Sequence, residues 1–235
     1  MVRILFIASI IVFFNYSISA SCNDLLTDKQ WYVNAKKYVE ADKVILDNET
    51  LKNNNFSTNY KLRQQAETNI IQSCNPSNED IISILDTDDI LNLKIALITI
   101  TLKNIFLKDI VNIVVSNYWN SNDFFYRYYS QLYFKALPKD IVQSYKNDIV
   151  SIFLREDNES IILAGLPTLL KFEPCDVDQV YAKYFTSGTK GLKRGSLSYL
   201  NSVDKDYLQK LKYCLTEKKQ IKALSEIKTL ENDFE

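Results

Sequence analysis

The sequence predicts an all-α fold, and more specifically a short right-handed α-solenoid of helix pairs with capping helices at its N- and C-terminal ends. Two observations lead to this prediction. A pattern of apolar and small residues recurs every 34 residues over a little more than half of the chain. The 235 residues include only four glycines and four prolines, and an all-β protein of this size needs many more of these turn-forming residues. We therefore expect helices with short connections, and no strands in the repeated region.

The repeat becomes visible when the chain is aligned on itself with the 34-residue offset. Two aligned apolar sets predict the first helix of each pair: Ile81, Val115 and Ile149, and Leu85, Trp119 and Phe153. An aspartate follows in each unit, at Asp89, Asp123 and Asp157. Three further sets have the spacing of one face of a second helix: Ile95, Tyr129, Leu163 and Leu197; Ala96, Ser130, Ala164 and Ser198; Ile98, Leu132, Leu166 and Leu200.

Each part of this unit has a physical role. Two short antiparallel helices cannot bury their apolar faces alone, so neighbouring pairs must stack. The aspartate falls at the turn, where its carboxylate can accept hydrogen bonds from the free N–H groups that begin the second helix. The small residue lets neighbouring helices approach closely, so we expect Ala96, Ser130 and Ala164 at equivalent buried positions.

The period alone is that of tetratricopeptide repeats, but that family requires a small residue where this chain has Ile84, Tyr118 and Ile152. The pattern of aspartate, turn and aliphatic helix in LREDNESIILAGLPTLLKF, residues 154–172, instead resembles HEAT-like, armadillo-type repeats. The resemblance is one of architecture and covers residues 77–204. The fourth unit departs from it, because Gly191 stands in place of the aspartate and Lys183 and Ser187 stand at core positions.

Three other segments complete the predicted organisation. Residues 1–20 read as a secretory signal peptide: Arg3 precedes an apolar run, and Ala20 ends the small-residue cleavage region. An uncleaved membrane anchor is the alternative. Residues 21–76 form an N-terminal helical segment, with a capping box from Thr27 to Gln30, a loop over 48–56 and a break at Asn75 and Pro76. Residues 205–235 form the C-terminal capping helices.

All four cysteines lie beyond the predicted cleavage site, which favours two disulfides in an oxidising compartment. Of the three connectivities, we favour Cys22–Cys74 and Cys175–Cys214, because each joins sequence neighbours. No CxxC pair supports a metal site instead. Cys22 also follows Ser19, Ala20 and Ser21, which leaves lipid modification of this cysteine, and thus attachment to a membrane, as an alternative.

Composition excludes several kinds of chemistry. The chain contains no histidine, so catalytic Ser–His or Cys–His pairs and imidazole metal sites are impossible. The net charge is −1 and no basic domain is apparent, so nucleic acid is not expected as a partner. The carboxylates of Asp86, Asp88 and Asp89 are explained by capping rather than by cation binding. We expect no cofactor and no enzymatic activity.

The segment DFFYRYYSQLYFKAL offers a candidate binding surface. If Phe125, Tyr129 and Leu132 face the core, then Phe124, Arg127, Gln131 and Phe134 lie on the opposite side of the helix, with Arg127 and Phe134 at least partly accessible. Aromatic and arginine side chains are favoured anchors at interfaces. The competing interpretation is that neighbouring elements bury these aromatics.

These features predict an exported, periplasmic or secreted, non-enzymatic protein that binds or scaffolds another polypeptide on a concave surface, as an inhibitor or immunity-type protein would. A structural lipoprotein attached to the membrane through Cys22 is the alternative function. A hydrolase that uses a carboxylate pair is a third candidate, although no carboxylate pair stands apart from the capping positions.

Overall fold

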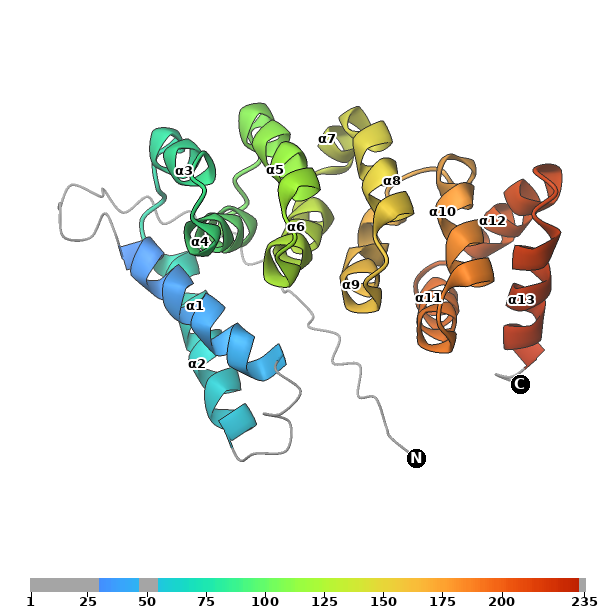
Figure 1. Cartoon of the computed structure of the whole chain (residues 1–235), viewed down its shortest axis with the longest axis horizontal. Helices are drawn as coiled ribbons and strands as arrows, with labels where there is room; N and C mark the ends of the chain where they lie inside the picture. Colours follow the sequence, from blue (N-terminus) through green and yellow to red (C-terminus); the bar gives the residue numbers. More distant parts are fainter. Residues whose placement is uncertain (1–29, 47–54, 233–235) are drawn as a thin grey trace.

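The computed structural model describes residues 30–46 and 55–232, and these residues form thirteen helices and no strand. The all-α prediction is thus confirmed for this part of the chain. The helices follow one another along the long axis of the molecule (Figure 1). None of the described helices combines the length and the apolar character that crossing a bilayer requires.

An N-terminal hairpin and a series of shorter helices make up the chain. The hairpin consists of α1 (Gln30–Leu46) and α2 (Asn55–Gln72). The next helices are α3 (Asn78–Leu85), α4 (Ile90–Leu102), α5 (Lys108–Asn120), α6 (Phe124–Ala136), α7 (Lys139–Ser144), α8 (Lys146–Arg155) and α9 (Glu159–Leu169). The last are α10 (Pro174–Ser187), α11 (Lys190–Val203), α12 (Lys205–Glu217) and α13 (Ile221–Asn232).

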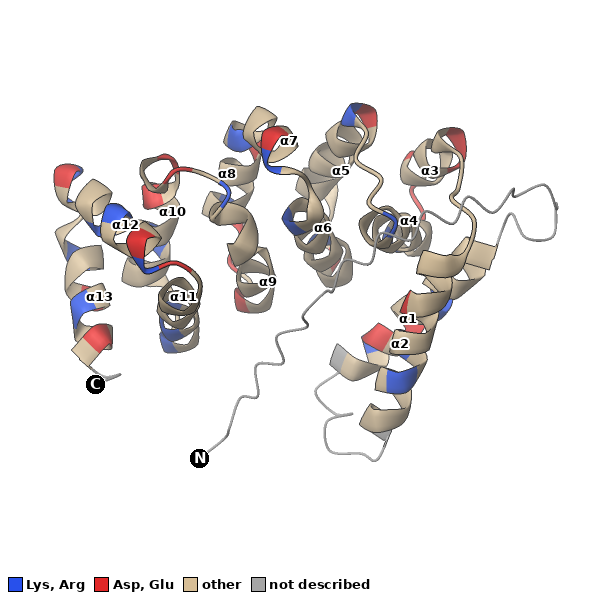
Figure 2. Cartoon of the chain, turned by 180° about the vertical axis from the view of Figure 1, so that it is seen from behind, with Lys and Arg blue, Asp and Glu red and all other residues tan. Residues whose placement is uncertain are grey.

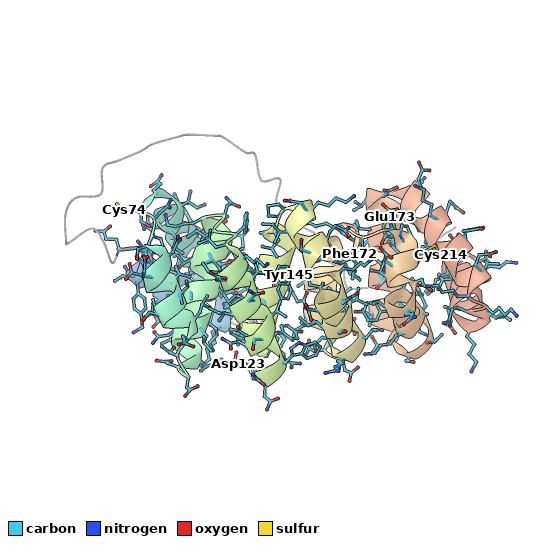
Figure 3. The ribbon with its side chains drawn as sticks, turned by 90° about the horizontal axis from the view of Figure 1, so that it is seen from above. Cys74, Asp123, Tyr145, Phe172, Glu173 and Cys214 are labelled. Atoms are coloured by element: carbon cyan, nitrogen blue, oxygen red, sulfur yellow. A yellow bond between two sulfur atoms is a disulfide. The ribbon has the colours of Figure 1, made fainter. Side chains whose placement is uncertain are left out.

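The helices from α3 to α11 lie in two layers. Along the upper side of Figure 1 run α3, α5, α8 and α10, and along the lower side run α4, α6, α9 and α11. Each lower helix contacts the next one, from α4 to α6, α9 and α11, and the upper helices also contact one another in order. Asp123, between α5 and α6, lies on one long edge, whereas Cys74 and Glu173, in connections between pairs, lie on the opposite edge (Figure 3).

Capping residues fix the start of each lower helix, but their spacing is not constant. The side chains of Asp89, Asp123, Asn158 and Thr189 accept hydrogen bonds from backbone N–H groups of the first turn. The intervals are therefore 34, 35 and 31 residues. The prediction that Asp157 is a cap is wrong, because its side chain is 87% exposed and pairs with Lys183 at 2.7 Å.

The buried side chain of Glu156 explains this shift. Its Oε1 accepts hydrogen bonds from the backbone N–H groups of Asp157, at 3.1 Å, and Asn158, at 2.9 Å. This inward-turned glutamate lengthens the turn by one residue, so that Asn158 becomes the cap.

The small residue of the repeat lies seven positions after each cap. With the caps as origin, the residues at this position are Ala96, Ser130, Gly165 and Ser196, and all four are buried. The predicted members Ala164 and Ser198 are half-buried and exposed, because a fixed period of 34 misses the unequal turns. Trp119 also departs from the predicted core set: its side chain is exposed, and the Arg155 guanidinium lies 4.6 Å from its ring centroid.

Side chains of one pair satisfy the carbonyl groups that end the helices of the preceding pair. The amide of Asn117 donates to the Leu85 carbonyl at 3.0 Å, and Lys103 Nζ donates to the Ser73 carbonyl at 2.6 Å. Lys183 Nζ donates to the carbonyls of Leu154 and Glu156, both at 2.9 Å. The last four carbonyls of a helix have no partner inside it, so these bonds explain why polar residues such as Lys183 occupy positions between stacked pairs.

The hairpin covers one end of the lower layer. Both α1 and α2 contact α4, and Tyr32 donates to Asn92 of α4 at 2.6 Å. As a consequence α4 has neighbours on both sides, and its residues from Ile95 to Ile100 are all buried. The apolar character of α4 around its whole circumference fits this position.

Helices α12 and α13 pack against α10 and α11 at the other end of the series (Figure 1). A disulfide between Cys175, at the start of α10, and Cys214, in α12, joins the two helices, with 5.2 Å between the Cα atoms. This pairing was predicted and is confirmed. Of the predicted Cys22–Cys74 bond, only Cys74 lies among the described residues. Cys22, the Thr27 capping box and the signal peptide lie outside them.

Candidate interaction surface

The structure separates the four residues of the predicted binding surface on α6. Gln131 and Phe134 are buried, Phe124 is half-buried, and the Arg127 side chain is 28% exposed. The prediction that Phe134 is partly accessible is therefore wrong, whereas partial exposure of Arg127 is confirmed. The reason is the orientation of α6: its core side consists of Tyr126, Tyr129, Ser130, Gln131, Tyr133 and Phe134.

Arg127 takes part in an ion pair inside the molecule. Its Nη1 lies 3.0 and 2.9 Å from the two carboxylate oxygens of Glu156, whose side chain is only 1% exposed. The hydroxyl of Tyr118 donates to the same carboxylate at 2.6 Å. Burial, together with this bond to Glu156, raises the Tyr118 pKa far above its ordinary value. These contacts fix the turn between α8 and α9 against α5 and α6.

Gln131 belongs to the same buried cluster. Its amide nitrogen donates to the Tyr118 hydroxyl at 3.4 Å. Its Oε1 has no hydrogen-bond partner among the described residues and lies against Gly165, where an added Cβ would come within 2.3 Å of it. Gly165 thus provides the space that Gln131 fills, and Gln131 stabilises helix packing rather than offering a contact to a ligand.

A second polar cluster joins the hairpin to α6. The buried carboxylate of Asp42 accepts from Arg63 Nη1 at 2.7 Å and from the Tyr129 hydroxyl at 3.0 Å. Burial, with the neighbouring Asp42 charge, raises the pKa of Tyr129 well above its ordinary value. The Arg63 guanidinium also lies 5.3 Å from the ring centroid of Tyr60. This cluster holds the hairpin against α6 as well as α4.

Neither cluster has the arrangement of a catalytic or metal site. Both carboxylates are saturated by cations and hydroxyl groups of the chain. Among the described residues, no group of three or more acidic or cysteine side chains is placed to bind a metal ion. Asp89, from the acidic stretch at 86–89, accepts from the N–H groups of Leu91 and Asn92 and thus acts as a cap.

The surface that remains open lies on the outer side of the lower layer. Five and nine residues after each cap, α6, α9 and α11 carry side chains that are half-buried or exposed. These are Tyr128 and Leu132 on α6, Leu163 and Pro167 on α9, and Arg194 and Ser198 on α11. We call this set the open face. Leu163 approaches Gly195 of α11, where an added Cβ would lie 2.9 Å from the leucine Cδ2, so part of this side chain fills the contact between α9 and α11.

The same positions are more buried on α4, the lower helix that the hairpin contacts. The equivalent residues of α4 are Lys94 and Ile98, and Ile98 is only 2% exposed. Lys94 contacts the next lower helix through Asp123, at 3.2 Å, and through the ring of Phe125. Tyr128 of the open face lies near Asp42 and Arg63 of the hairpin, because both charges act on its hydroxyl.

Sequence reasoning placed Leu132 and Leu163 on core faces. The fixed period of 34 residues explains the error for Leu163, because the cap of α9 is Asn158, whereas Leu132 keeps the register of Ile98 and is half-buried nonetheless. The signal that places Leu163 is the series of cap residues, Asp, Asp, Asn and Thr, which sets the phase of each helix separately. No protein-family model, curated protein or solved structure matches this chain.

Proposed function

We propose that the chain is an exported, non-enzymatic protein with a HEAT-like solenoid architecture, which binds another polypeptide on the open face. The observation that carries this proposal is the contrast between Ile98, which is buried on α4, and its half-buried equivalents Leu132 and Pro167 on α6 and α9. The apolar character of this position therefore continues on α6 and α9, where the side chains are less covered.

Three features support this reading. The order of the lower helices and the side-chain bonds between successive pairs are those expected of a stacked array. The half-buried apolar side chains of the open face lie on two successive helices, α6 and α9, which suits a partner that spans both. The Cys175–Cys214 disulfide is consistent with an oxidising compartment and therefore with export.

Site-specific cross-linking tests the proposal. A photo-reactive amino acid at position 132 or 163 should form a covalent adduct with the same polypeptide in the exported fraction. The same amino acid at position 213 should not, since Tyr213 is exposed on α12, away from the face.

A variant with Leu163→Asp should lose the adduct at position 132 while keeping its helical circular dichroism. Equal cross-linking at positions 132, 163 and 213, or an adduct that survives Leu163→Asp, would show that the open face is not the binding site.

A further inference from the structure

A groove of about 440 Å³ follows the contact between α1 and α2. On each helix its lining residues recur at spacings of three and four, as one side of a helix does. They include Lys37, Ala41 and Val44 on α1 and Leu62, Ala66 and Asn69 on α2. Asp42, which reaches Tyr129 of α6, lies on another side of α1. The groove thus belongs to a side of the hairpin that does not pack against the array.

Two alanines form the floor of the groove. Ala41 and Ala66 are buried, and their short side chains leave the space between the two helices unfilled. On the rim, Leu62 is 51% exposed, and so is Val33, which lies one turn before Lys37 on the same side of α1. Removal of such apolar surface from water is favourable, so the groove and its rim suit a docking helix.

A polar group in the groove also lacks a partner. Asn34 lines the groove and is only 9% exposed, yet its amide forms no hydrogen bond with another described residue. An amide that loses its remaining water without gaining a partner is costly, and this group can both donate and accept. The occupant of the groove should therefore supply polar side chains as well as apolar ones.

The charges beside the groove favour a second copy of the same hairpin. Lys37 and Glu40 lie one turn apart on α1, are both exposed and form no ion pair with a described residue. Both signs of charge occur on α1 and α2 (Figure 2), so this surface selects neither an acidic nor a basic partner. In a two-fold dimer, contacts are reciprocal, and an antiparallel copy of α1 brings Lys37 to Glu40 of the second copy and Glu40 to its Lys37.

We infer that two copies of this chain associate through their hairpins, with the two α1 helices antiparallel across a two-fold axis near Lys37 and Glu40. Two reciprocal ion pairs form, and Val33 and Leu62 of each copy lose contact with water. The second copy also brings amide side chains of its own to the groove, among them Asn69. The inference goes beyond the proposed function, because the open face lies on other helices.

The dimensions of the hairpin limit the strength of this dimer. Helices of 17 and 18 residues are about 26 Å long and, side by side, about 20 Å wide. The contact therefore buries about 1,000 Å² over both copies, which is the lower limit for specific interfaces. We expect a reversible dimer that dissociates on dilution, rather than an obligate one.

Sedimentation equilibrium of the full-length protein over a range of concentrations tests the inference. The protein should be monomeric well below about 1 µM and dimeric well above about 100 µM. Lys37→Glu should weaken dimerisation at least about tenfold, because only acidic side chains then meet at the axis. Glu40→Lys should weaken it similarly through its cations. An equimolar mixture of the two variants should form a heterodimer with nearly the original affinity, since opposite charges meet again.

Two further variants separate the groove from general effects of charge and folding. Lys36→Glu changes the net charge equally at an exposed position of α1 that does not line the groove, and it should leave dimerisation unchanged. Leu62→Asp places a charge on the apolar rim and should weaken dimerisation. Circular dichroism should show that all of these variants keep their helices, because the altered side chains are exposed.

Several results would overturn the inference. A protein that stays monomeric at all concentrations contradicts it, and so does a dimer that Lys37→Glu leaves intact. Failure of the mixed variants to associate would rule out the reciprocal ion pairs. A photo-reactive amino acid at position 37 identifies other occupants: in a monomeric protein, an adduct with a different polypeptide, or with residues before Gln30 of the same chain, would show that this segment fills the groove instead. The adducts at positions 132 and 163 do not depend on these results.

Discussion

At the scale of single residues, the buried carboxylate of Glu156 is compatible with the fold only while its hydrogen-bond and ion-pair partners remain in place. Its carboxylate is held by Arg127, by the Tyr118 hydroxyl and by two backbone N–H groups. Removing one partner of such a pair leaves an uncompensated charge, which costs more than the pair contributes when it is intact. The cluster therefore fixes the turn that sets the position of α9.

Arg127→Met should lower the free energy of unfolding by about 3 kcal/mol, because Glu156 loses its cation while it remains buried. Urea unfolding measures this value. The matched control, Lys146→Met, breaks the more exposed pair with Asp176 at 3.1 Å and should cost at most about 1 kcal/mol. The double variant Arg127→Met/Glu156→Gln should recover part of the loss. Additive costs in this double-mutant cycle would show that the two side chains are not coupled.

The contact of Gly165 with Gln131 gives a second prediction at this scale. Gly165→Ala should destabilise the protein by ~1–3 kcal/mol, because the new methyl group would collide with Gln131 Oε1 and with the Phe153 ring. The neighbouring substitution Ala164→Leu, at a half-buried position, should cost less. If the midpoints of urea unfolding fall in the opposite order, the buried position belongs to Ala164 and the register derived from the caps is wrong.

At the scale of elements, much of the secondary structure could be predicted from the sequence. The break at Pro76 and the aspartate caps of α4 and α6 are local signals, and the helices follow them. The residues at which α9 and α11 begin, and therefore the side chains that face the core, could not be predicted. They depend on the inward turn of Glu156 and on Thr189 as a cap. The burial of Phe134 also escaped prediction, since it depends on how α6 packs against other helices.

The disulfide between α10 and α12 should stabilise the C-terminal end in particular. It links residues separated by 39 positions, and the loop-closure model gives a contribution of about 4 kcal/mol. The variant Cys175→Ala/Cys214→Ala should lose about this amount in unfolding experiments. Hydrogen exchange should accelerate in α10–α13 more than in α4–α6. A uniform acceleration over all helices would indicate that the bridge stabilises the molecule only as a whole.

At the scale of the whole molecule, different helices pack against the two ends of the series. The hairpin covers α4, the disulfide-linked helices close the other end, and the open face lies between them. The alignment revealed the series of pairs, but the expectation that no basic domain exists overlooked the excess of basic over acidic residues after residue 182, eleven against seven. The contact between the hairpin and α4 could not be predicted from periodicity, because α4 is apolar on all sides and the pattern does not show which side meets the hairpin.

Stability should depend on pH in the alkaline range. Burial lowers the pKa values of Lys103 and Lys171 from 10.5 to about 8. Between these values the unfolded chain binds more protons than the folded one, so the free energy of unfolding should rise with pH from about 8 toward 10. Above about 10, the trend should reverse, because burial raises the pKa values of Tyr129, Tyr181 and Tyr184 and only the unfolded chain ionises these residues.

Chemical unfolding across this pH range checks both trends, and tyrosinate absorbance should appear together with unfolding. Substitution of both lysines by methionine should flatten the rise. Tyrosine ionisation at ordinary pKa values in a protein that is still folded would contradict the burial of these side chains.

Covalent footprinting with a carbene reagent tests the central claim, that the open face binds a polypeptide, most directly. In the free protein, Leu132, Leu163 and Pro167 should be labelled, whereas Ile98 and Phe134 should not. In the complex with the polypeptide captured by cross-linking, labelling of these three residues should fall while that of Tyr213 stays constant. Unchanged labelling of the open face, with protection elsewhere on the molecule, would contradict the claim.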